Sequence, residues 1–177
     1  MAHIADSVTM YTRKEIASMK EIEFVFLTEP KPIQSVRFCR FGEHVRTYQP
    51  KSNIEWKNFI RLSASKQIPK NWEPLEGAIG IKVDFVFSPL RSFSKKTTAA
   101  IFAGYKVFKE TKPDLCDNLL KGFCDALSGI CWRDDSQICK VESEKYFGKS
   151  PMIIIKAQEI GLEKKENSPD LFVDKIS

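Results

Sequence analysis

The sequence predicts one α+β domain built on a mixed β-sheet with two main helices. The chain has 177 residues, a length that suits a single domain. Hydrophobic residues make up 42% of it, which is enough for a packed core. Its segments follow in the order strand, hairpin, helix, strand, helix, strand, strand, and this order is typical of an α+β fold.

The first segments predict a strand and a hairpin. Residues 21–26 begin with alternating apolar and polar side chains, which indicates a strand, and Pro30 ends it. Residues 37–41 and 45–48 flank a turn at Gly42, an arrangement typical of a β-hairpin.

A helix and the clearest strand come next. Residues 54–65 have helical spacing, and their expected buried side carries Trp56, Phe59, Ile60 and Ala64. Residues 79–87 alternate, so we expect the apolar side chains on one face and Lys82 and Asp84 on the other.

Residues 88–112 are expected to form a long basic connection. Their six cations against the single acid Glu110 give a net charge of +5. A connection of this length is more often functional or mobile than merely connective. Contact with a polyanion is one interpretation, and a solvated loop is the other.

The last third predicts a helix and two further strands. The helix spans about residues 118–128 and ends at Gly129. Residues 137–146 and 152–157 resemble strands around Gly148, and we expect them to pair as a hairpin.

The expected domain organisation has three parts. Residues 1–20 form an N-terminal extension, residues 21–158 form the folded domain, and residues 159–177 form a flexible charged tail.

Composition argues against several classes of protein. The net charge of +5 favours a polyanionic partner. No apolar run approaches the roughly 20 residues of a membrane-spanning helix, and the first residues show no secretory pattern. The five cysteines are odd in number and widely spaced, which argues against a disulfide framework or a zinc site. We therefore expect a cytoplasmic protein with no membrane partner and, without a glycine-rich phosphate loop, no nucleotide cofactor.

Acidic side chains gather around the helix of the last third. Asp117, Lys121 and Asp125 recur at i, i+4 and i+8, which places them on one helix face. Asp114 precedes this helix, and Asp134 and Asp135 follow it. The helix spans roughly 16 Å, and an extended loop after it could return about the same distance, so Asp135 can reach Asp114 and Asp117. Carboxylates this close are tolerated when a hard cation such as Mg²⁺ lies between them.

Each of these acids also has an ordinary structural explanation. Asp117 near a helix start can act as a cap. Asp117, Lys121 and Asp125 can form a solvated ladder of ion pairs. Asp134 and Asp135 can belong to a simple turn, so spacing alone leaves both explanations open.

Motifs in the same stretch carry a resemblance to a known family. They are Asp117-Asn118-Leu119-Leu120-Lys121, Asp125-Ala126-Leu127 and Trp132-Arg133-Asp134-Asp135-Ser136-Gln137. Upstream, the family pattern is matched by Pro30-Lys31-Pro32, Arg37-Phe38 and Thr47-Tyr48-Gln49-Pro50-Lys51. Over about residues 21–158 the chain resembles the RusA family of Holliday junction resolvases, the crossover junction endodeoxyribonucleases of bacteria and their phages.

The resemblance implies a homodimeric nuclease that uses Mg²⁺, with Mn²⁺ as an alternative ion, to nick four-way DNA junctions in recombination and repair. By motif matching, Asp114, Asp117 and Asp135 would be the metal ligands. Asp117, Asp135 and Lys121 would be the catalytic residues, with Lys121 orienting water or stabilising negative charge. Asp134 would support the metal ligands without binding the metal itself, and Asp125 would be structural.

Basic side chains are the candidates for contact with DNA phosphates. By position they are Arg37, Arg40, Lys51, Lys95, Lys96 and Lys145.

The spacing of the first two acids departs from the family pattern. The family has one residue between them, whereas Leu115 and Cys116 separate Asp114 from Asp117. On a strand, positions i and i+3 face opposite ways, so a bulge that absorbs Cys116 would be needed to keep both acids together. A protein that binds branched DNA without cutting it is therefore an alternative, and a nuclease for flaps or RNA is a third.

Overall fold

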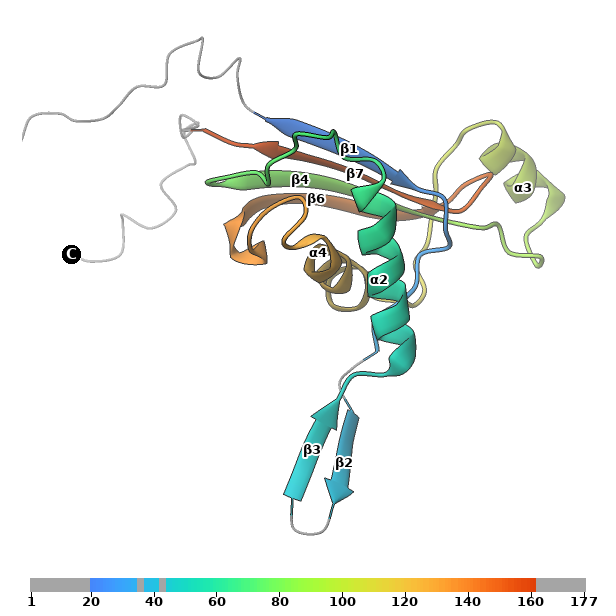
Figure 1. Cartoon of the computed structure of the whole chain (residues 1–177). Coiled ribbons are helices and arrows are strands. Elements are labelled where there is room, and N and C mark those ends of the chain that lie inside the picture. The colour runs from blue at the N-terminus through green and yellow to red at the C-terminus, as the bar shows by residue number, and fades with distance from the viewer. Residues whose placement is uncertain (1–19, 35–36, 42–43, 162–177) are drawn as a thin grey trace, which may run out of the picture.

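The structure is a computed structural model that describes residues 20–34, 37–41 and 44–161 (Figure 1). The predicted extension over 1–20 and the predicted tail over 159–177 lie almost entirely outside the described residues. The last described strand runs to Glu159, two residues beyond the end at residue 157 that the sequence predicts.

Five strands form one mixed sheet in the order β1-β7-β4-β6-β5. They are β1 (Glu21–Phe26), β4 (Ile79–Phe87), β5 (Val107–Phe108), β6 (Ile138–Phe147) and β7 (Met152–Glu159). β4 and β6 run parallel, and the other neighbours run antiparallel. This sheet, with helices packed on it, confirms the predicted α+β fold class.

The predicted hairpin between the last two strands is wrong. β6 and β7 do not pair with each other, because β4 lies between them and pairs with both. The predicted alternation of β4 also fails near its ends, where Gly80 and Val86 are buried together with their neighbours. A strand buried on both faces belongs at the centre of a sheet, which separates two strands that are adjacent in sequence.

Residues 88–112 are not the plain connection that the sequence predicts. They contain α3 (Lys95–Phe102) and the short strand β5. Ser94 caps α3 by accepting the backbone N–H of Thr97 at 3.1 Å, and Ile101 anchors the helix in the core. β5 then pairs with the end of β6.

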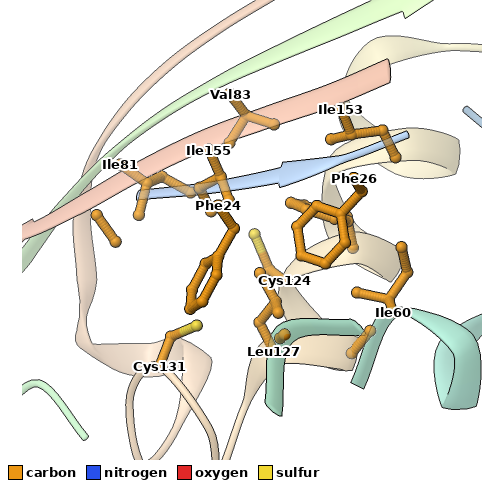
Figure 2. Packing of buried hydrophobic residues seen from close by; sticks show 14 of the residues in the cluster. Phe24, Phe26, Ile60, Ile81, Val83, Cys124, Leu127, Cys131, Ile153 and Ile155 are labelled. Atoms are coloured by element: carbon orange, nitrogen blue, oxygen red, sulfur yellow. The ribbon is translucent and has the colours of Figure 1, made fainter. Parts of the chain in front are cut away.

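Helices α2 (Lys51–Ser65) and α4 (Lys121–Leu127) contact each other on one face of the sheet (Figure 1). Figure 2 shows Phe24 and Phe26 of β1 among Ile60 of α2 and Leu127 of α4. The prediction of α2 is confirmed, but Phe59 is 45% exposed and lies outside its buried row. Neighbouring helix positions point about 100° apart, so Phe59 turns away from the core that Ile60 enters.

The predicted hairpin in the first half is confirmed as β2 (Arg37–Phe41) and β3 (His44–Tyr48), which form a separate two-stranded sheet. Four cysteines of the described residues are free thiols, at positions 116, 124, 131 and 139. None of the described helices combines the length and the apolar character needed to cross a membrane.

Candidate functional site

The segment that joins the first two acids is helical rather than extended. Residues Leu115–Leu120 form the π-helix η1, which continues directly into α4. In η1 the backbone N–H of Leu119 donates to the carbonyl oxygen of Asp114 at 3.2 Å. A π turn holds one residue more than an α turn, so Cys116 is accommodated in a helical turn, and the condition of a strand bulge does not apply.

Asp114 stands at the N-terminal end of η1 in an extended conformation. Asn118 Nδ2 donates to Asp114 Oδ2 at 3.1 Å. Lys145 of β6 fixes the loop before it, since its Nζ donates to the carbonyl oxygens of Thr111 and Pro113 at 2.9 Å and 2.7 Å. Lys145 is one of the predicted DNA contacts, but its ammonium group holds this loop in place.

A pocket of about 510 Å³ lies between α2 and the continuous helix η1–α4. Asp117 and Lys121, one helical turn apart, both line it and are exposed. Within the described part of the chain, neither side chain has an ion-pair partner, so both are available to a ligand. The remaining lining residues are Ile33, Gln34, Gln49, Asn53, Lys57, Asn118, Gly122 and Asp125.

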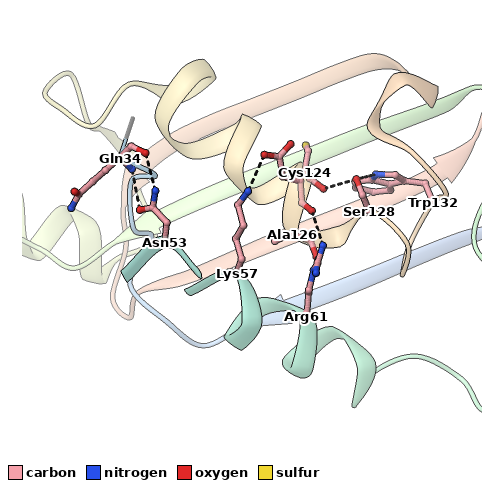
Figure 3. A network of polar contacts seen from close by, with 9 residues as sticks. Gln34, Asn53, Lys57, Arg61, Cys124, Ala126, Ser128 and Trp132 are labelled. Carbon is pink, nitrogen blue, oxygen red and sulfur yellow. Dashed lines mark hydrogen bonds and ion pairs between the residues drawn. The ribbon is translucent and has the colours of Figure 1, made fainter. Parts of the chain in front are cut away.

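A row of polar side chains on α2 holds this pocket together (Figure 3). Lys57 Nζ lies 3.0 Å from Asp125 Oδ2, and Arg61 Nε donates to the carbonyl oxygen of Ala126 at 3.1 Å. One turn earlier, Asn53 binds the backbone of Gln34 through two hydrogen bonds. Asp125 therefore has a structural partner, as the motif comparison implies, and that partner is Lys57 rather than Lys121.

Sequence reasoning missed Lys57 and Arg61. Their spacing with Asn53 at i, i+4 and i+8 was a readable signal for one polar helix face. The spacing could not predict their partners, Asp125 and Ala126, because these lie about 65 residues away in the chain.

The second pair of acids lies in a short 3-10 helix, η2 (Asp135–Gln137). Asp134 caps it by accepting the backbone N–H of Ser136 at 2.9 Å, and hydrogen bonds from Ser136 lower the pKa of the Asp134 carboxyl. Asp135 is exposed in the first turn. Gln137 Nε2 fastens η2 to the segment before β4 by donating to the carbonyl oxygens of Leu75 and Gly77.

The loop before η2 does not return to the start of the helix as the sequence predicts. It closes into a compact turn in which the N–H of Gly129 donates to the carbonyl oxygen of Trp132 at 2.7 Å. Trp132 is fully buried, so it anchors this turn in the core. The predicted extended path over Gly129–Arg133 is therefore wrong.

Asp114 and Asp135 are consequently held at different ends of β6. The loop before Asp114 is bonded to Lys145, whereas η2 leads into Ile138. Seven positions on a strand place the Cα atoms of Ile138 and Lys145 about 23 Å apart. In agreement with this separation, no group of three or more Asp, Glu, His or Cys side chains within the described ranges could hold a metal ion.

Asp135 is nevertheless not remote from α4. Burial raises the pKa of the Cys124 thiol to about 12, and the negative charges of Asp125 and Asp135 add to this rise.

Four of the other predicted DNA contacts lie on the surface. Lys95 and Lys96 are exposed in the first turn of α3, and Arg40 is exposed on β2. Lys51 is exposed at the start of α2, with its Nζ 3.7 Å from Glu55 Oε1. The side chain of Arg37 lies outside the described part of the structure.

The comparison with known proteins agrees with these motifs. The family model described as endodeoxyribonuclease RusA matches residues 28–158. The chain belongs to the RusA family. The matched range includes β2–β3, the pocket, η1–α4 and η2, so the whole candidate site lies inside it.

A relative is found in Bacillus subtilis (strain 168), the uncharacterized protein YqaN. It is 27% identical over 142 residues, which cover 71% of this chain and 96% of YqaN. The RusA family comprises resolvase-type endodeoxyribonucleases. Membership of this family therefore implies that the chain has the fold of a nuclease that acts on DNA.

Proposed function

We propose that the protein is a Mg²⁺-dependent endonuclease that resolves four-way DNA junctions by paired nicks. The observation that carries the proposal is the pair Asp117 and Lys121, exposed, without ion-pair partners among the described residues, and facing one pocket in a RusA-family chain. An acid and a lysine one turn apart can divide the work of phosphodiester hydrolysis without a histidine.

The donor set suits a hydrated Mg²⁺ ion. Asp117 offers an exposed carboxylate in the pocket, and Asp114, at the N-cap of η1 and outside the pocket lining, offers a second exposed carboxylate. Mg²⁺ prefers oxygen ligands, keeps several waters and is commonly held by only one or two carboxylates. When bound, the ion supplies an activated water and charge neutralisation at the phosphate. Lys121, on the same pocket wall, would bind the phosphate oxygen on which negative charge develops.

A homodimer accounts for the position of Asp135. Within one chain Asp135 belongs to η2, which leads into the start of β6, whereas the loop before Asp114 is bonded to Lys145 near the other end of β6. A two-fold dimer presents the same surface twice, so Asp135 of one protomer can face Asp117 of the other. Such a dimer would also place two pockets symmetrically on a junction that has near two-fold symmetry.

The proposal is tested with purified protein and a synthetic four-way junction. We expect paired nicks with Mg²⁺, none with EDTA, and none from Asp117→Asn, which keeps the shape of the side chain but removes its charge. Glu110→Gln is the matched control, because Glu110 is an exposed acid outside the pocket lining, and its loss should leave cleavage unchanged. Unchanged cleavage by Asp117→Asn would remove the basis of the proposal.

A protein that binds junctions without cutting them is the second candidate. It is favoured by the extra residue between Asp114 and Asp117, which lies in the π turn, and by the hydrogen bond that Asn118 Nδ2 already donates to Asp114. This candidate predicts salt-sensitive junction binding in EDTA and no nicks with Mg²⁺ or Mn²⁺. Deletion of Cys116 would then restore cleavage, and an inactive deletion variant that is folded would count against this explanation. Competition experiments with flap and RNA substrates distinguish these two junction-directed candidates from a nuclease that prefers flaps or RNA.

A further inference from the structure

The β2–β3 hairpin projects from the rest of the molecule. Figure 1 shows it extending beyond the end of α2 and away from the five-stranded sheet. Its two strands pair with each other and, among the described strands, with no other. An isolated two-stranded hairpin is marginally stable in water, so a partner that packs against it would stabilise it.

The side chains of this hairpin suit a polyanion. Phe38 is 75% exposed and Tyr48 49% exposed, and the side chains of Arg40 and Arg46 are exposed as well. The described residues of the two strands, 37–41 and 44–48, include no aspartate or glutamate. Arg40 pairs with Val45 and Arg46 with Cys39, so the alternation of the strands puts the two arginines on opposite faces.

The base of the hairpin is fixed to the rim of the pocket. Asn53 is buried at 3% exposure and binds both the N–H and the carbonyl oxygen of Gln34, just before β2. β3 runs through Gln49 into α2, and both Gln34 and Gln49 line the pocket that holds Asp117 and Lys121. A molecule bound along the hairpin therefore passes the candidate site.

We propose that the β2–β3 hairpin stands in the major groove of one duplex arm of the DNA substrate and holds that arm against the pocket. This inference rests on the proposed function. The major groove, about 12 Å wide, admits a two-stranded ribbon. Phosphates line both walls of the groove, which matches arginines on both faces of the hairpin. Pairing with the same hairpin of a second copy is disfavoured, because a two-fold contact would bring cation against cation.

The length of the hairpin determines how many base pairs of the duplex arm it can contact. Strands of five residues extend about 17 Å, which corresponds to about five base pairs of duplex. The arm must then be longer than about five base pairs beyond the cut for the hairpin to contribute. This requirement gives the protein a minimum arm length that the pocket alone would not impose.

The test measures junction binding in EDTA, so that it does not depend on cleavage. One junction has arms of about 15 base pairs, and a second has one opposed pair of arms cut to about three base pairs and closed by loops. The hairpin variant is Arg40→Gln/Arg46→Gln. The control variant, Lys66→Gln/Lys70→Gln, removes the same charge from exposed positions after α2.

On the long-armed junction, the hairpin variant should bind more weakly. Each lost phosphate contact removes about 0.9 from the slope of log K against log salt, so the slope should be shallower by about 1.8 for each hairpin that engages an arm, and by about 3.6 when both hairpins of a dimer do so. On the short-armed junction the hairpin variant and the unaltered protein should bind alike. The control variant should show no such dependence on arm length.

Three outcomes overturn the inference: equal weakening on both junctions, no weakening on either, or loss of the dimer in sedimentation, which would assign the hairpin to a contact between copies. The result is separable from the proposed function. If the protein cleaves junctions but the hairpin variant binds them normally, only the hairpin contact is refuted. If binding depends on arm length but no cleavage occurs, only the nuclease activity is refuted.

Discussion

Asn53→Ala should destabilise the protein at the junction between the hairpin and the helix pair. The variant removes two hydrogen bonds, from the Gln34 N–H to Asn53 Oδ1 at 3.1 Å and from Asn53 Nδ2 to the Gln34 carbonyl oxygen at 2.8 Å. Each such bond contributes about 1 kcal/mol net, and the buried site loses packing as well, so we expect a loss of about 2–3 kcal/mol. For a chain of this size, that lowers Tm by about 4–12 °C.

Urea-induced unfolding, followed by tryptophan fluorescence, measures this change. Asn71→Ala is the control, because Asn71 is exposed and its substitution should cost less than about 0.5 kcal/mol. Amide exchange at Gln34 should also become faster in Asn53→Ala, since its N–H loses its acceptor. A loss no larger than that of Asn71→Ala, with unchanged exchange at Gln34, would refute the role given to this pair of bonds.

Two other predictions concern the site and the core. If Asp135 completes the site of the partner protomer, Asp117→Asn and Asp135→Asn should each be inactive alone. After the two variants are mixed and allowed to exchange subunits, the mixed dimers contain one intact site and should make single nicks. A mixture that stays inactive would place both acids of a site in one chain. Burial raises the pKa of Cys124 and Cys131 from 9.0 to about 12, so thiols that ionise only after unfolding should make stability fall as pH rises from about 9 towards 12. Urea midpoints at pH 8 and pH 10 measure this, and Cys124→Ala/Cys131→Ala should show a smaller fall; an equal fall in that variant would contradict the assignment.

Local spacing predicted the parts of the site that lie on one element. Asp117 and Lys121 are four residues apart, and any helix through them puts both side chains on one side. The structure places both on the wall of one pocket, although the helix begins with a π turn that the sequence did not indicate. The inserted residue lies before Asp117, so it cannot alter the relation between these two side chains.

Contacts between distant segments decided what the sequence could not predict. The position of Asp135 depends on the path of the chain after α4, and that path is set by the burial of Trp132 and by a hydrogen bond from the Leu75 N–H to the Cys131 carbonyl oxygen at 2.7 Å. The pairing of β6 follows in the same way from β4, which lies about 60 residues earlier in the chain. Neither partner can be recognised from the residues next to Asp135 or Gly148.

The polar row of α2 links these local and distant contributions. Asn53 fixes the base of the hairpin, and Lys57 pairs with Asp125 on α4. Arg61 donates to carbonyl oxygens near the C-terminal end of the same helix. One rigid helix therefore sets the distance from the hairpin to the wall that carries Asp117 and Lys121. If DNA lies along the hairpin, this helix determines which phosphate reaches the pocket, because it aligns the two elements without itself carrying either candidate catalytic residue.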